Sequence, residues 1–321
     1  MVDFQQGLRR VSRRIPMNDL GTLIALLGLC VIMTILSPRF LMVSNFTNIF
    51  VQISIISIIA VGMTFVILTG GIDLSVGSIV AFCGLLLGSC IVNFKLPIWV
   101  GILAALCAGT SVGFINGILI SRLNLPPFIA TLGTMSIVRG AAFSITGGSP
   151  VYTYPKPFLR IAGNAGPLPI PIIIEIVIFI IALYVLKYTK LGRYSYSIGG
   201  NEAASKLSGI NVPRYKTAVY TILGFLCSVS SIILVARLDS AVPVAGEGYE
   251  MEAIAAVVIG GTSMSGGEGK IWGTIIGSLI MGVISNGLNL LTVPQGMQRM
   301  IRGLIIIVAV LVDVFRKRKQ A

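Results

Sequence analysis

The sequence predicts an all-α polytopic membrane protein with about ten transmembrane helices. Of its 321 residues, 55% are hydrophobic and only 11% are charged, and the mean hydropathy is +0.95. Several apolar runs reach the roughly 20 residues that a helix needs to cross the hydrocarbon core of a bilayer. A β-barrel would instead show short strands of alternating hydrophobicity. We therefore expect one transmembrane domain over residues 21–315.

The order of apolar runs and short polar loops sets the expected spans. The eighth run is too short to cross as a regular helix. It therefore either begins earlier, near Ala241, or is a broken helix that lines a cavity. The expected spans are 21–37, 46–69, 76–92, 98–120, 127–146, 170–186, 216–236, 251–262, 271–292 and 300–315.

Basic residues set the expected orientation. With the N-terminus inside, sixteen Lys and Arg residues fall in inside segments and five in outside segments, as the positive-inside rule expects. We therefore expect cytoplasmic tails at 1–20 and 316–321 and a basic cytoplasmic loop at 187–216. This distribution accounts for the net charge of +13 without a nucleic-acid partner.

Two external loops carry distinct compositions. The loop 147–169 is rich in Gly and Pro and is expected to be irregular and surface-exposed. The loop after the seventh span carries Asp239, Glu247, Glu250 and Glu252. Those acids either dock a soluble protein or are simply solvated.

A short polar helix is expected inside the cytoplasmic loop. Asn201 can cap it, Glu202 suits the positive end of its dipole, and Ala203 and Ala204 are good helix formers. Gly209 can take the left-handed conformation that ends a helix. This helix over 201–209 either docks on a soluble partner or is an ordinary capped loop helix.

Charged groups within the apolar region are few. Asp73 and Ser75 lie between the second and third spans, where one of them caps a helix or both belong to an interrupted helix at a pathway. Arg139 lies inside the fifth span, so it must face the bundle interior, a partner or a water-filled cavity.

Neutral polar and small residues complete the pattern within the spans. Asn116, Asn286 and Asn289 suit a neutral polyhydroxylated solute, or they join helices to one another. Gly109, Gly113 and Gly117 are expected to allow close helix packing. Residues 69–77 faintly echo 259–267, which indicates either a weak internal repeat or two similar turns. The expected pathway or gate residues are Asp73, Ser75, Asn116, Arg139, Thr262, Ser263, Asn286 and Asn289.

Catalysis, metal binding and nucleotide binding lack the residues they need. The chain has no histidine and five cysteines without metal-type spacing. Residues 266–271 resemble a phosphate loop, but Met264 and Ile271 stand where that pattern needs Gly and Ser or Thr. We therefore expect a transport protein that is not an enzyme and holds no cofactor or metal.

Several short motifs resemble one family closely. The chain resembles the permease subunits of bacterial monosaccharide ABC importers, most closely the ribose permease group, from about Leu23 to Asp313. The motifs that carry the resemblance are Ala60–Thr64, Gly71–Ser78, Phe128–Leu132, Arg139-Gly140, Leu191–Tyr194, Gly199–Ala204, Ala253–Val257, Gly260–Ser263 and Asn286–Asn289.

The resemblance implies a type II-like importer in the bacterial inner membrane. Its expected partners are a second permease subunit, forming a homodimer, a cytoplasmic ATP-binding subunit and a periplasmic or surface sugar-binding protein. It also implies that Asn201, Glu202, Ala203, Ala204 and Gly209 belong to the helix through which the ATPase acts. The solute would be ribose or a related pentose or hexose.

Two other function classes make different demands on the sequence. A stand-alone secondary transporter normally carries intramembrane acids or histidines for ion coupling, and these are nearly absent. An intramembrane protease needs a Ser–His pair or two intramembrane acids, and Asp73 is the one plausible acid.

Overall fold

The structure is a computed structural model that describes the backbone of residues 17–318 and the side chains of residues 21–311. Residues 1–16 and 319–321, which belong to the two predicted tails, lie outside the described residues. The long helices are α2 (Met17–Leu36), α3 (Val43–Leu68), α4 (Val76–Gly88), α5 (Ile98–Ser121), α6 (Pro127–Thr146), α8 (Ile170–Tyr188), α11 (Val212–Leu238), α13 (Ile271–Leu290) and α14 (Gln295–Arg318). Shorter elements are the π-helical turn η1 (Ser89–Asn93), α7 (Lys156–Leu159), the 3₁₀ turn η2 (Arg160–Ala162), α9 (Lys190–Gly200), α10 (Glu202–Leu207) and α12 (Tyr249–Ile259).

The helical membrane fold is confirmed. Within residues 17–318, seven helical segments are long and apolar enough to cross a membrane, namely α3, α4 with η1, α5, α6, α8, α11 and α13. The remaining three predicted spans coincide with α2, α12 and α14. Ten helices therefore stand at the predicted places, and seven of them meet the requirement of length and hydropathy.

The eighth predicted span is a half-length helix. α12 has 11 residues and starts after Gly248, whose φ is +86°. The chain before it forms the short strand β4 (Ser240–Ala241) and then turns. The helix therefore does not extend back to Ala241, and of the two predicted possibilities the broken helix is the one that the chain adopts.

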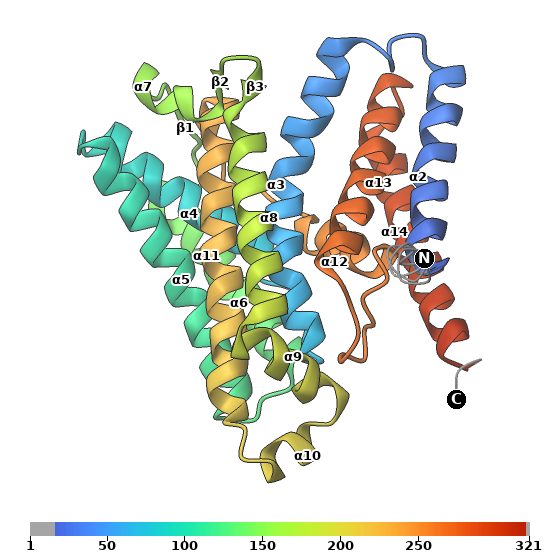
Figure 1. Cartoon of the computed structure of the whole chain (residues 1–321). Coiled ribbons are helices and arrows are strands. Elements are labelled where there is room, and N and C mark those ends of the chain that lie inside the picture. The colour runs from blue at the N-terminus through green and yellow to red at the C-terminus, as the bar shows by residue number, and fades with distance from the viewer. Residues whose placement is uncertain (1–16, 319–321) are drawn as a thin grey trace, which may run out of the picture.

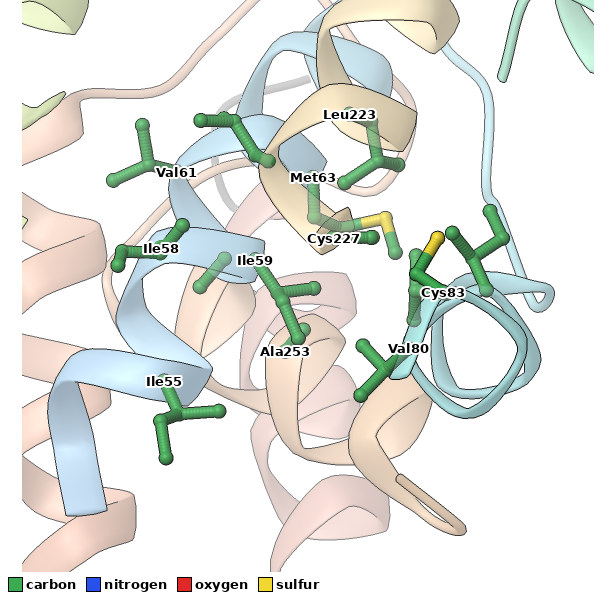
Figure 2. Close-up of a cluster of buried hydrophobic side chains, with 14 of the residues drawn as sticks. Ile55, Ile58, Ile59, Val61, Met63, Val80, Cys83, Leu223, Cys227 and Ala253 are labelled. Atoms are coloured by element: carbon green, nitrogen blue, oxygen red, sulfur yellow. The ribbon is translucent and has the colours of Figure 1, made fainter. Parts of the chain in front are cut away.

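Helix α3 occupies the centre of the bundle. It packs against α8, α11, α12 and α13, and 94% of its most apolar 18-residue window is buried. Figure 2 shows Ile55, Ile59 and Met63 of α3 among side chains such as Cys227 of α11 and Ala253 of α12. Most of α3 is thus enclosed by other helices, and its first turns, which include Val43 and Phe50, are exposed.

The predicted glycine stripe lies between α5 and α11. A Cβ atom on Gly109 would stand 2.0 Å from Ser228 Oγ, and one on Gly113 would stand 2.3 Å from the Tyr220 carbonyl oxygen. Gly117 faces the backbone of Thr217 in the same way. The expected packing role is confirmed, because larger residues at these positions would separate the two helices.

The two ends of the bundle carry different structures, as Figure 1 shows. One end carries α10, and we call it the α10 end. The opposite end carries α7 and four short strands, and we call it the β1 end. These strands are β1 (Val151–Tyr152), β2 (Asn164–Ala165), β3 (Leu168–Pro169) and β4.

The expectation that loop 147–169 is irregular is wrong in part. β1 pairs with β4 in antiparallel register, with Val151 opposite Ala241, and β2 pairs with β3. Asp239 Oδ1 also accepts a hydrogen bond from the Tyr154 amide at 2.8 Å. The partners of β1 and Tyr154 lie about 90 residues away in the sequence, so local turn composition does not reveal the order that they impose, whereas β2 and β3 pair across a local turn.

Candidate functional site

The α10 helix is defined by the residues at its two ends. Asn201 is its N-cap, and its Oδ1 accepts a hydrogen bond from the Ala204 amide at 2.9 Å. At the other end, Gly209 has a φ of +79°, and its amide donates to the Lys206 carbonyl at 3.0 Å. The helix spans Glu202–Leu207, so it is slightly shorter than the predicted 201–209 but begins and ends for the predicted reasons.

Glu202 fastens α10 to the helix that follows. Its carboxylate forms ion pairs with Lys206 at 2.8 Å and with Lys216 of α11 at 2.6 Å. Partial burial acts to raise the pKa of Glu202, but hydrogen bonds and charges from Lys206 and Lys216 outweigh it and lower the pKa. The group is therefore ionised at neutral pH and holds both lysines.

One face of α10 is anchored and the other is open. Ser205 is buried, and its hydroxyl lies 2.8 Å from the hydroxyl of Ser197 in α9. Ala203 and Ala204 are exposed, and Leu207 is 91% exposed. The sequence interpretation missed Leu207, although an apolar residue in an otherwise polar loop helix is a usable signal for a contact site.

Helix α9, which the sequence interpretation also missed, connects α10 to two loops of the bundle. A Cβ atom on Gly199 would stand 1.9 Å from the Leu68 carbonyl oxygen and 2.4 Å from the Gly267 amide nitrogen. The Gly267 amide donates to the Leu68 carbonyl at 3.0 Å, and Tyr196 Oη donates to the Gly269 carbonyl at 2.7 Å. We call this backbone contact of residues 199, 68 and 267 the glycine junction.

The loops that meet at the glycine junction are the two segments with the faint sequence echo. A Cβ atom on Gly266 would stand 2.8 Å from the Gly70 amide nitrogen. Residues 69–75 follow α3, and residues 260–270 follow the half-length α12. The structure thus brings together the two places where the apolar spans are interrupted.

Asp73, Ser75 and Asn116 form one buried network. The Asp73 carboxylate is inaccessible to solvent and accepts from the Ser75 amide at 2.8 Å and the Ser75 hydroxyl at 2.6 Å. Asn116 Nδ2 of α5 donates to Asp73 Oδ2 at 3.2 Å and to Ser75 Oγ at 2.9 Å. The network fixes the turn that starts α4 and links it to α5.

Thr262 and Ser263 lie in the loop after α12. Both are buried, and the Ser263 amide donates to the Glu268 carbonyl at 2.9 Å while Ser263 Oγ accepts from the Ser265 amide. The Thr262 hydroxyl is buried without a hydrogen-bond partner among the described residues. Ser263 therefore shapes the loop, whereas the Thr262 hydroxyl retains an unused hydrogen-bonding capacity.

Asn286 and Asn289 make contacts between helices. Asn286 of α13 and Asn45 of α3 donate to each other through their side-chain amides, at 2.9 and 3.2 Å. Asn289 Oδ1 accepts from Gln298 Nε2 of α14 at 3.0 Å. In this conformation the two asparagines join α3, α13 and α14, which is one of the two roles that the sequence left open.

Arg139 lies at a cavity formed by α4, α6, α12 and α14. One nitrogen of its guanidinium donates to the Pro243 and Ala245 carbonyls at 2.7 and 2.8 Å. The cavity has a volume of about 800 Å³, and we call it the outer cavity because the turn of residues 242–248 that borders it joins α12 to the strands of the β1 end. Its charged lining residues are Arg139, Glu247, Glu250, Glu252, Arg299 and Arg302.

The charges of the outer cavity are largely paired. Glu252 and Arg302 form a half-buried ion pair that links α12 to α14, and Arg302 also donates to Gln298. Glu247 and Arg299 stand 3.9 Å apart on a more exposed rim, where an ion pair contributes little. The sequence predicts that four acids after the seventh span are either solvated or dock a protein. Three of them, Glu247, Glu250 and Glu252, line this cavity.

Comparison with known proteins identifies a family of membrane permeases. Residues 45–310 match the family described as branched-chain amino acid transport system / permease component. The chain is 47% identical to the ribose import permease protein RbsC of Escherichia coli (strain K12), covering 95% of this chain and 96% of that protein. It is 45% identical to the ribose import permease protein RbsC of Bacillus subtilis (strain 168), covering 92% and 93%.

A more distant relative extends the comparison. The D-allose transport system permease protein AlsC of Escherichia coli (strain K12) is 38% identical, over 91% of this chain and 90% of that protein. No solved structure matches the chain.

Proposed function

The chain belongs to the branched-chain amino acid transport system / permease component family, and we propose that it is the membrane permease subunit of an ATP-driven sugar importer. The observation that carries this proposal is the similarity to ribose and allose permeases over nearly the full length of both chains. ATP hydrolysis belongs to a separate subunit, because the chain lacks a phosphate loop. The protein resides in the bacterial inner membrane as a multi-pass protein.

The α10 helix is the proposed contact for the ATP-binding subunit. Its inner face is held by Ser205 and by the Glu202–Lys216 ion pair, so a force applied to α10 passes into α9 and α11. Its open face presents Leu207, which is 91% exposed. An exposed apolar side chain on a short helix is suited to dock in an apolar groove of a partner. The α10 end is then cytoplasmic, as are both chain termini.

The glycine junction is the proposed route from α10 to the transport pathway. At this junction backbone touches backbone, so a shift of α9 displaces the ends of α3 and of the loop after α12 together. Those segments carry Asp73, Ser75, Thr262 and Ser263, four of the eight predicted pathway or gate residues. A change in the ATPase would thus reach the interrupted spans through rigid contacts, as alternating access requires.

The outer cavity is the proposed entry site for the sugar. It lies toward the β1 end, opposite α10, where an external binding protein would deliver its ligand. Its paired arginines and carboxylates offer hydrogen bonds with little net charge, which suits a neutral polyhydroxylated solute. The cavity volume of about 800 Å³ falls within the range of small-molecule sites.

A second copy of the chain is the proposed partner within the membrane. α14 borders the outer cavity and presents Met297, Met300, Leu304 and Ile307 outward, each more than half exposed. A second copy packed against this face would enclose the cavity between two subunits.

Transport by the reconstituted complex tests this function. The permease is purified with its ATP-binding subunit, placed in liposomes with the binding protein, and supplied with labelled ribose, allose or fructose. Uptake that requires ATP on the side of the liposome membrane where the ATP-binding subunit lies supports the proposal. Uptake by the permease alone, driven by an ion gradient, would replace it with the secondary-transporter alternative.

A further inference from the structure

A second cavity is a groove between α5 and α11 at the α10 end, away from the outer cavity. The two helices run side by side in Figure 1, and the groove has a volume of about 820 Å³. Its lining residues are Phe114, Arg122, Asn211, Pro213, Arg214, Thr217, Ala218, Thr221 and Ile222. None of these lining residues is acidic, so the groove is positively charged.

The lining of the groove changes from basic to apolar along its length. Arg122 follows the last residue of α5, and Arg214 lies in the first turn of α11, so both stand at the α10 end. Phe114 and Ile222 each lie eight residues further into the same helices, about 12 Å along the axis at 1.5 Å per residue. The groove therefore has a cationic mouth and an apolar interior at membrane depth.

The floor of the groove is rigid. Ser121 and Thr217 hydroxyls are 2.9 Å apart across the two helices, and Gly117 stands against the Thr217 backbone. Close contact at this level fixes the two helix ends from which Arg122 and Arg214 project. The groove is thus a feature of the packed helices and does not depend on a flexible loop.

The two guanidinium groups are uncommitted. Arg122 and Arg214 are both exposed, and neither side chain has an acceptor among the described residues. The nearby Asn211 side chain is occupied, because its Oδ1 accepts from the Arg214 amide at 3.1 Å. Two free arginines at one mouth present guanidinium donors, which are well suited to bind phosphate oxygens.

We propose that this groove binds one anionic phospholipid, with its phosphate between Arg122 and Arg214 and an acyl chain along Phe114 and Ile222. A basic pocket between transmembrane helices on the cytoplasmic side is the setting in which lipid headgroups bind. A soluble protein could reach the arginines but not the apolar interior, which lies within the spanning parts of α5 and α11. Free phosphate would leave that interior empty.

The test measures lipid retained by the full-length protein. Protein in mild detergent is mixed with phosphatidylglycerol or phosphatidylcholine, and bound lipid is counted by native mass spectrometry. The variants are R122Q/R214Q, which removes both charges, and Ala218→Trp, which fills the groove without changing charge. Arg193→Gln is the matched control, because Arg193 is an exposed arginine of α9 outside the groove.

Wild-type protein should retain one phosphatidylglycerol in preference to phosphatidylcholine. The double variant should weaken that preference by roughly 25-fold, since each basic residue near a membrane surface contributes about fivefold. Ala218→Trp should abolish retention, and Arg193→Gln should leave it unchanged. Equal retention of the two lipids, full retention by either groove variant, or complete displacement by inorganic phosphate would overturn the proposal.

Two further measurements keep the result interpretable. A variant that fails to elute as a single species is set aside, and the comparison of lipids and phosphate on the wild-type protein then decides. If R122Q/R214Q keeps its lipid but no longer co-purifies with the ATP-binding subunit, the arginines serve that protein and the lipid proposal is wrong.

Discussion

Glu202 of α10 and Lys216 of α11 form an ion pair of 2.6 Å, across a sequence separation of 14 residues. The lysine side chain is 16% exposed and the glutamate 40%. The pair closes the turn between the two helices. It thereby connects a helix that projects from the bundle to α11, which packs along α3, α4 and α5.

Removing the Glu202 charge should impair transport more than folding. The Glu202→Gln variant loses both ion pairs but stays inserted, because a partly exposed pair contributes at most about 1 kcal/mol to stability. ATP-dependent sugar uptake should fall severalfold while the protein level in the membrane is unchanged. Glu268→Gln, a change of an exposed acid in another loop at the α10 end, should transport normally. Equal uptake by both variants would contradict a role of Glu202 in coupling.

The Glu202 ion pairs should also make the stability of the folded protein depend on pH under acidic conditions. Because the pKa is lowered from its ordinary value of 4.5, the pairs stabilise the folded protein at all pH values above 4.5. Their contribution is lost as the pH falls through the lowered pKa. The difference in thermal stability between wild type and Glu202→Gln should therefore be constant above pH 4.5 and shrink below it. A difference that shrinks between neutral pH and 4.5 would show that the pKa is not lowered.

The glycine junction should not accept a methyl group at position 199. In Gly199→Ala the new Cβ would meet the Leu68 carbonyl and the Gly267 amide at less than 2.5 Å, so the backbones must separate. We expect a loss of about 1–3 kcal/mol of stability and a larger loss of uptake.

The neighbouring glycine provides the control for that variant. A Cβ on Gly200 meets nothing within 4 Å, so Gly200→Ala should keep both stability and uptake. The melting temperature in detergent and the uptake rate in liposomes are measured for both. Identical behaviour of the two variants would exclude a transmitting role for the junction.

Exchanging the side chains of Asp73 and Asn116 should reveal the hydrogen bond between them in the melting temperature. In Asp73→Asn the new amide group meets the Asn116 amide, donor against donor, and a buried unpaired donor costs about 1–3 kcal/mol. The double variant Asp73→Asn/Asn116→Asp restores a donor–acceptor pair and should recover part of the lost melting temperature. Independent, additive losses in the double variant would show that the two side chains do not interact.

Arg139 should support transport because it holds the turn before α12 in place. Arg139→Gln removes the hydrogen bonds to the Pro243 and Ala245 carbonyls, so the turn before α12 is released over the outer cavity. Uptake at saturating binding protein should fall by at least tenfold. Ser144→Ala, an exposed position of α6 that does not line the outer cavity, should change uptake by less than twofold, and an equal loss in both would point to general damage of α6.

Much of the fold follows from the sequence because its causes are local. Apolar runs locate the helices, and the cap at Asn201 and the left-handed Gly209 limit α10. The spacing of Gly109, Gly113 and Gly117 places α5 against another helix. Each of these features depends on residues within one or two turns of each other.

The remaining features depend on partners far apart in the sequence. Asn45 and Asn286 are 241 residues apart, and β1 meets β4 across about 90 residues, so neither pairing leaves a local pattern. The same holds for Lys216 as the partner of Glu202 and for the arginines that pair with the acids of the outer cavity. Sequence alone therefore supplied the polar residues of the candidate site but not their partners.

Co-purification with the ATP-binding subunit tests the central claim most directly. Tagged wild-type permease, Leu207→Asp and the control Leu168→Asp, an exposed leucine of β3 at the opposite end, are isolated from native membranes in mild detergent. Bound proteins are quantified by mass spectrometry. The account predicts a stoichiometric ATPase with a phosphate loop on wild type and Leu168→Asp, and its loss from Leu207→Asp. Full retention on Leu207→Asp would contradict docking through α10, and no ATPase on wild-type protein that still transports alone would contradict the importer itself.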